Sequence, residues 1–185
     1  MTPGEALKAA IEMNDLKWVQ ELLDRYICDY SDAMADAAGL NRLDVVNLIL
    51  TDIPTNRSAS LKVIDRTGSL LDDDSDDMLD IMQKSALSAA RNGHVAVLER
   101  LLRMVIDQVR YSLLPFVIQC VLDEGAVQGQ LAVVQSMIEH TSTRHYRDLF
   151  PRLDSYAEPD DTLPKAIRAG QSGVVEYLVN EMDSS

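Results

Sequence analysis

The sequence predicts an all-α fold, an α-solenoid of about five stacked helix-turn-helix pairs with long irregular insertions. Three observations support this prediction. A small residue pair followed by two variable residues and Gly or Asn recurs five times, apolar residues follow each copy at fixed offsets, and a helix-length segment precedes each copy. The 185 residues, 46% of them hydrophobic, suffice to bury one core.

The first helix of each pair is predicted to end at the Gly or Asn, which we call the stop. Gly and Asn tolerate a positive φ best, as the position after a helix end requires. A small Ala or Gly four residues earlier lets two helices approach closely. The stops are Asn14, Asn41, Gly93, Gly129 and Gly170, and the small residues are Ala10, Ala37, Ala89, Gly125 and Ala166.

The second helix of each pair is predicted from the residues after the stop. Offsets of two, four, five, eight and nine lie on one broad stripe of a helix. Of the 25 residues at these offsets 24 are apolar, the exception being Ser172, whereas chance at this composition gives about 11 or 12. Each segment is therefore expected to form an amphipathic helix of roughly three turns that another element must cover.

We expect one domain over residues 1–185, with repeats near 5–28, 32–52, 76–107, 112–141 and 162–182 and insertions near 53–75 and 142–161. The first insertion contains Asp72, Asp74 and Asp76 at a calcium-loop spacing. Asp77 and Gln83 stand where such a loop needs Gly and Glu, so no metal site is predicted. The acidic segment is instead expected to lead into a helix over 76–90, capped around Ser75.

Two copies resemble the ankyrin repeat, whose signature is close to L-H-x-A-A-x-x-G-H-x-x-V-V-x-x-L-L. Ser88–Leu102 reads SAARNGHVAVLERLL, and 163–179 reads LPKAIRAGQSGVVEYLV. The spacing from the small pair to Gly separates this motif from other helix-pair repeats. The resemblance implies an ankyrin-like solenoid, in which His94 has a structural role in its turn.

The chain also departs from that family. The Thr-Pro-Leu-His start of the first helix is missing from every copy. The steps between copies are 27, 52, 36 and 41 residues, in place of a period of about 33. The helix pairs are therefore the part of the family pattern that this chain retains.

Composition excludes several classes of function. The formal net charge of −13 disfavours nucleic acid and anionic membranes as partners. Two cysteines are too few for a disulfide framework, the first residues lack the pattern of a signal peptide, and apolar runs are shorter than the roughly 20 residues of a membrane span. We expect a cytoplasmic or nuclear protein without a cofactor, of undetermined oligomeric state.

The resemblance implies a non-catalytic adaptor that binds a protein partner on its concave face. In ankyrin units the two residues between the small pair and the Gly lie on that face. Three apolar residues among them, Met13, Leu40 and Val127, are candidate anchors. The predicted partner-binding residues are Glu12, Met13, Leu40, Arg91, Asn92, Val127, Gln128 and Arg168.

An alternative function is a small-molecule-binding protein or atypical enzyme with a pocket closed by the insertions. Its reactive groups would be Asp123, Glu124, His140 or His145. For the two adjacent carboxylates a salt bridge to an arginine is the favoured explanation over an acid-base pair. The sequence contains no phosphate-binding loop, nucleophile elbow or zinc-binding motif.

Overall fold

The computed structural model describes residues 2–26, 30–60, 74–108, 114–142 and 159–184, and every regular element in these ranges is an α-helix. Ten helices are present there, which confirms the all-α prediction. They are α1 (Pro3–Glu12), α2 (Leu16–Arg25), α3 (Tyr30–Gly39), α4 (Leu43–Ser60), α5 (Asp74–Arg91), α6 (Val95–Gln108), α7 (Leu114–Val127), α8 (Leu131–Ser142), α10 (Pro159–Arg168) and α11 (Ser172–Ser184).

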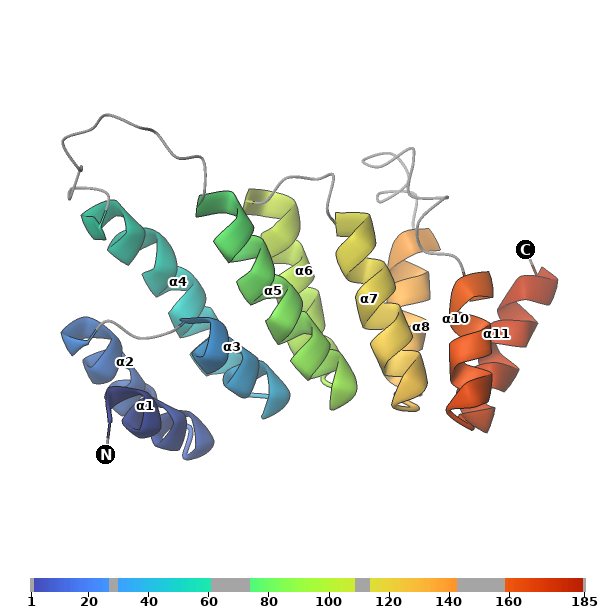
Figure 1. The fold of residues 1–185 in the computed structure, drawn as a ribbon, viewed down its shortest axis with the longest axis horizontal. Helices are drawn as coiled ribbons and strands as arrows, with labels where there is room; N and C mark the ends of the chain where they lie inside the picture. The colour runs from blue at the N-terminus through green and yellow to red at the C-terminus, as the bar shows by residue number, and fades with distance from the viewer. Residues whose placement is uncertain (1, 27–29, 61–73, 109–113, 143–158, 185) are drawn as a thin grey trace.

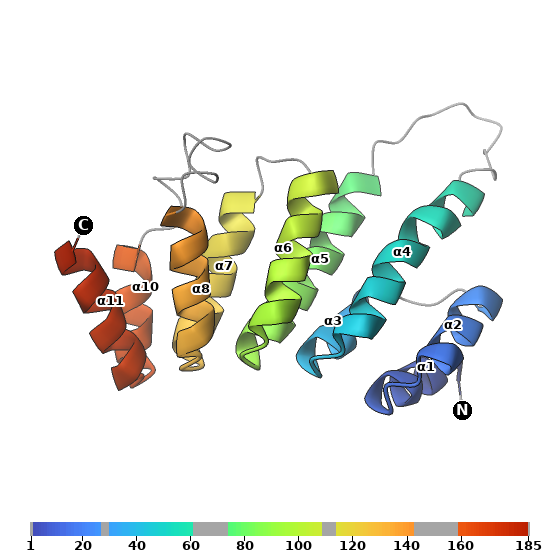
Figure 2. The same cartoon turned by 180° about the vertical axis from the view of Figure 1, so that it is seen from behind.

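The helices form pairs that lie side by side in chain order (Figures 1 and 2). Helices α1, α3, α5, α7 and α10 are the first helices, and each contacts the next of this set. The second helices α2, α4, α6, α8 and α11 contact one another in the same sequence behind them. The tight turns within the pairs all lie along one edge, at the bottom of Figure 1.

All five predicted stops have a positive φ. Asn14 and Asn41 have φ of 56° and 57°, and Gly93, Gly129 and Gly170 have φ of 77°, 73° and 73°. In each turn the stop and the residue after it donate backbone hydrogen bonds to carbonyls of the small pair, as Gly93 does to Ala90 and His94 to Ala89. The turn prediction is confirmed at every copy.

The core lies between the two layers and continues from pair to pair. In the first four pairs the residues at offsets five, eight and nine are buried, whereas the offset-two residues are half-buried or, at Leu16, exposed. At Gly125 the approach is so close that even a Cβ would lie only 2.8 Å from Cγ1 of Val133. The close approach of first and second helices is confirmed at this position.

Two helix bounds differ from the sequence expectation. Helix α4 continues to Ser60, into the segment predicted as an insertion. Helix α5 begins at Asp74, so the predicted cap at Ser75 is wrong, because acidic and hydroxyl side chains also favour the first turn of a helix. Residues 61–73 and 143–158 of the two insertions lie outside the described residues.

Candidate functional site

The turns between first and second helices form a continuous edge that we call the turn edge. It consists of Glu12, Met13, Leu40, Arg91, Asn92, Val127, Gln128 and Arg168, the eight predicted partner-binding residues, all of which are exposed. Met13, Leu40 and Val127 are 62%, 43% and 37% exposed. The predicted exposure of these residues is confirmed.

A row of hydrogen bonds runs beneath the turn edge and joins each pair to the one before it. The residue directly after each stop donates through its side chain to the carbonyl two residues before the preceding stop. The four bonds are Arg42 to Glu12 at 2.8 Å, His94 to Gly39 at 3.0 Å, Gln130 to Arg91 at 3.1 Å and Gln171 to Val127 at 3.0 Å. The turns are therefore held in register by their own side chains.

His94 fits this row because a carbonyl oxygen only accepts hydrogen bonds, so Nε2 of the imidazole carries the proton. The side chain is half-buried between the turns of two pairs. In the first pair the corresponding residue is Asp15, whose carboxylate accepts from the backbone of Trp18 and caps α2. The structural role expected for His94 is confirmed.

Ion pairs join every two consecutive first helices. Arg91 Nε lies 2.8 Å from Glu124 Oε1, which confirms the predicted salt bridge to an arginine for that carboxylate. Asp123 pairs instead with Lys165. The remaining two pairs are Lys8–Asp36 at 3.8 Å and Lys84–Asp32 at 2.5 Å.

The two adjacent carboxylates are thus divided between opposite neighbours. Glu124 reaches back to α5, where it raises the pKa of Arg91 chiefly through their hydrogen bond, and it also accepts from Gln128. Asp123 reaches forward to α10, where the buried hydroxyl of Thr162 donates to it at 2.8 Å. Gln119 donates to Asp123 at 3.0 Å as well. These contacts make both side chains part of the packing between pairs.

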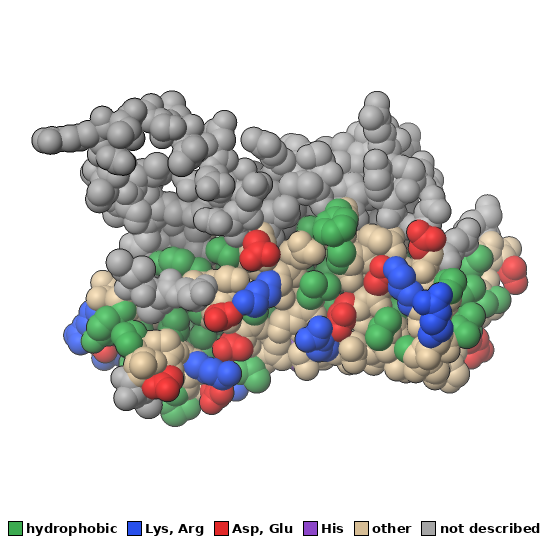
Figure 3. Space-filling model, in the orientation of Figure 1, with side chains coloured by type: hydrophobic (Ala, Val, Ile, Leu, Met, Phe, Trp, Pro, Cys, Tyr) green, Lys and Arg blue, Asp and Glu red, His purple; other side chains and the backbone are tan. Residues whose placement is uncertain are grey.

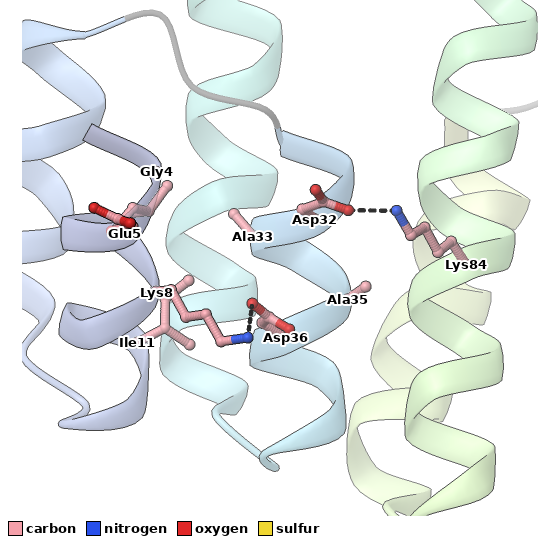
Figure 4. A pocket seen from close by; sticks show the side chains of 10 residues that line it. Gly4, Glu5, Lys8, Ile11, Asp32, Ala33, Ala35, Asp36 and Lys84 are labelled. Atoms are coloured by element: carbon pink, nitrogen blue, oxygen red, sulfur yellow. Dashed lines mark hydrogen bonds and ion pairs between the residues drawn. The ribbon is translucent and has the colours of Figure 1, made fainter. Parts of the chain in front are cut away.

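A shallow groove of about 470 Å³ lies between α1 and α3 on the first-helix face (Figure 4). Leu7, Ile11 and Ala33 form its apolar part. The ion pairs Lys8–Asp36 and Lys84–Asp32 border it, the second one reaching α5. The groove therefore lies between the first helices of the first two pairs and extends to Lys84 of α5.

The other candidate reactive groups do not form a cluster in the described residues. His140 lies in the last turn of α8, and His145 lies outside the described residues. The two cysteines were not candidates: Cys28 lies outside the described residues, and Cys120 is half-buried, which raises the pKa of its thiol. In the described ranges no group of His, Cys, Asp and Glu side chains is suited to hold a metal, and no helix has the length and hydropathy of a membrane span.

The row of turn bonds was not anticipated from the sequence. A signal for it exists, because Arg42, His94, Gln130 and Gln171 are all long side chains with an N–H donor at one position of the repeat. A hydrogen-bond donor directly after each stop therefore predicts a bond from that side chain to a neighbouring turn.

Comparison with known proteins adds no family: no protein-family model matches the chain, and no curated protein matches it.

Proposed function

We propose that this protein is a non-catalytic interaction module, an ankyrin-like solenoid that binds a protein partner through the turn edge and the first-helix face beside it. The observation that supports it best is the exposure of large apolar side chains at Met13, Leu40 and Val127. Met13 and Leu40 occupy the same position in adjacent turns, so we expect them to form one apolar patch. Such side chains in rigid, ordered turns are suited to anchor an interface.

Rigidity is the second argument for binding. The backbone beneath the patch is held by left-handed stops and by the side-chain bonds of Arg42 and His94 to the preceding turns. A surface ordered before binding loses little conformational entropy when the partner docks. The ankyrin-like motif around Gly93 supports the same class of function.

Charge suggests the polar part of the partner. Arg91 and Arg168 expose cationic side chains on the turn edge of a protein whose net charge is −13. We expect them to face acidic groups of the partner, at a rim that contributes to specificity and association rate. The same acidity disfavours nucleic acid and anionic membranes and so favours a protein partner. The proposed compartment is the cytoplasm or nucleus.

The test replaces the three anchors at once, as Met13→Asp, Leu40→Asp and Val127→Asp. Because all three side chains are exposed, the circular dichroism spectrum and Tm should stay close to those of the parent. Capture from the native cell, quantified by mass spectrometry, should lose the main stoichiometric protein by at least about tenfold, since 1.4 kcal/mol of lost affinity gives that factor.

A matched control carries three added acidic groups elsewhere, as Ala96→Asp, Ala132→Asp and Gly173→Asp on exposed sites of the second helices. This control should capture the partner as the parent does. Equal loss in both triple variants would show a general effect of charge. Unchanged capture by the turn-edge variant would place the interface elsewhere.

A further inference from the structure

The last pair, α10–α11, exposes apolar side chains at positions that are buried in the four earlier pairs. Three residues before the stop, the side chain is fully buried in each earlier pair, whereas Ile167 is 57% exposed. Nine residues after the stop, the side chain is at most 8% exposed in each earlier pair, whereas Val179 is 41% exposed. The buried counterparts are Ile11, Ala38, Ala90 and Ala126, and Leu23, Leu50, Leu102 and Ile138.

The turn of the last pair is uncovered in the same way. A Cβ added at Gly93 or Gly129 would lie 2.5 Å or 2.4 Å from the amide oxygen of the glutamine that the following pair places there. At Gly170 nothing lies within 4 Å of such a Cβ. The carbonyl of Arg168 stands where the carbonyl of Val127 accepts from Gln171 one pair earlier. The α10–α11 end therefore has the uncovered turn glycine and the carbonyl acceptor that, in the two preceding pairs, meet the glutamine of the following pair.

The charged part of that interface is present as well. Arg168 is exposed and stands two residues before its stop, as Arg91 does. Arg91 reaches Glu124, which stands five residues before the next stop. Figure 3 shows Lys and Arg side chains beside hydrophobic ones over the α10–α11 end. A carboxylate at the corresponding place of an added pair would meet Arg168.

We propose that this end face, formed by Ile167, Arg168, Gly170 and Val179, docks a helix hairpin of another protein, which stacks on α10–α11 as a sixth pair. The hairpin has an apolar inner side, an amide, imidazole or guanidinium donor just after its turn, and a carboxylate five residues before its turn residue. This is a second interaction surface, separate from the turn edge.

The chain's own first pair lacks the polar groups that such a hairpin needs. Asp15 stands at the donor position, and its carboxylate only accepts hydrogen bonds, so it would oppose the carbonyl of Arg168. Ala9 stands where the carboxylate is required. Two copies packed end face to end face would bring together two arginines and two acceptors. A second copy is therefore a poor occupant.

The experiment supplies a hairpin with the required features. A copy of residues 114–142 is appended after residue 185 of the full chain, through a flexible Gly-Ser linker as long as the segment 143–158. The copy brings its own Gln130 as donor and its own Glu124 as carboxylate. Hydrogen exchange of the α10 and α11 amides should slow at least tenfold relative to the chain with the linker alone, and unchanged exchange would overturn the proposal.

Two controls identify the surface. With Ile167→Asp and Val179→Asp in the host part, the slowing should disappear, while the same host variant without the copy keeps the parental Tm because both side chains are exposed. With Gln130→Ala and Glu124→Ala in the appended copy alone, the host is untouched and the slowing should be reduced several-fold. Slowing that survives both changes would overturn the proposal.

The native occupant is tested on the full chain without the copy. Sedimentation equilibrium should show one monomeric mass at all concentrations. A dimer that Ile167→Asp and Val179→Asp abolish would assign the face to a second copy and overturn the proposal. In capture, the hairpin protein should be lost with these two substitutions and retained by the turn-edge triple variant, so the two proposals fail separately.

Discussion

At the scale of single residues, the stops combine a backbone requirement with a contact to the next pair. Gly93 and Gly170 have nearly the same φ, 77° and 73°, but the amide of Gln130 lies over Gly93 and nothing lies over Gly170. A substitution at Gly170 therefore measures the free-energy cost of a positive φ alone. The same substitution at Gly93 adds the cost of moving the side chain of Gln130.

We predict that Gly170→Ala lowers the free energy of unfolding by about 1 to 2 kcal/mol, the cost of a left-handed L-residue. Gly93→Ala should cost about 1 kcal/mol more, because Gln130 must move and loses its hydrogen bond to Arg91. Urea unfolding of both variants measures the difference. Equal losses would show that the bond of Gln130 contributes nothing to stability.

Two half-buried groups predict lower stability at alkaline pH. Burial raises the pKa of Cys120, with a further contribution from Asp123, and burial raises the pKa of Tyr177, with further contributions from Glu181 and Glu139. Folding therefore favours their protonated forms. Their contribution to stability is full below the ordinary pKa of a thiol and a phenol, about 8.5 and 10, and is lost as pH rises through the higher folded values.

The measurement is the urea midpoint between pH 7 and pH 10.5. In the parent it should fall over the alkaline part of this range, and Cys120→Ser combined with Tyr177→Phe should make the fall less steep. An identical pH dependence in the parent and the double variant would show that other groups cause the effect.

At the scale of helices and turns, the row of turn bonds predicts which substitutions are tolerated. His94 occupies the position that Gln130 and Gln171 occupy in the next two pairs, and all three donate to a carbonyl of the preceding turn. We predict that His94→Gln keeps most of the stability, whereas His94→Ala loses about 1 kcal/mol. Thermal or urea unfolding checks both.

Asn92 provides the control for this prediction, because its side chain donates to the carbonyl of Ser88 in its own pair, so this hydrogen bond does not join two pairs. Asn92→Ala should have a smaller effect than His94→Ala. A glutamine at position 94 that destabilises as much as alanine would contradict the interpretation of the row as one repeated bond.

The sequence predicted those features that depend on a few adjacent residues. Gly93 and Asn41 determine the ends of their helices locally, and the apolar offsets after them determine which face is buried, so the helix pairs were predictable. The partner of Asp123 was not, because Lys165 is brought to it only by the packing of α7 against α10. The start of α5 was misplaced since several consecutive residues there suit a first turn.

At the scale of the whole molecule, each inner pair is covered by two neighbours and each end pair by one. In such an arrangement stability is close to a sum of contributions from the pairs and from the interfaces between neighbours. We predict that amides of α5 and α7 exchange more slowly than those of α1 and α10. Native-state hydrogen exchange resolved by residue measures this order, and equal protection throughout would indicate a single cooperative unit.

The turn bonds all have one direction: the donor belongs to the later pair and the carbonyl acceptor to the earlier one, from Arg42 to Gln171. Synthesis on the ribosome proceeds in that same direction. Each accepting carbonyl is therefore synthesised before the side chain that bonds to it. The pairs can therefore pack in the order of their synthesis, because each pair provides the carbonyl acceptor for the side chain of the next.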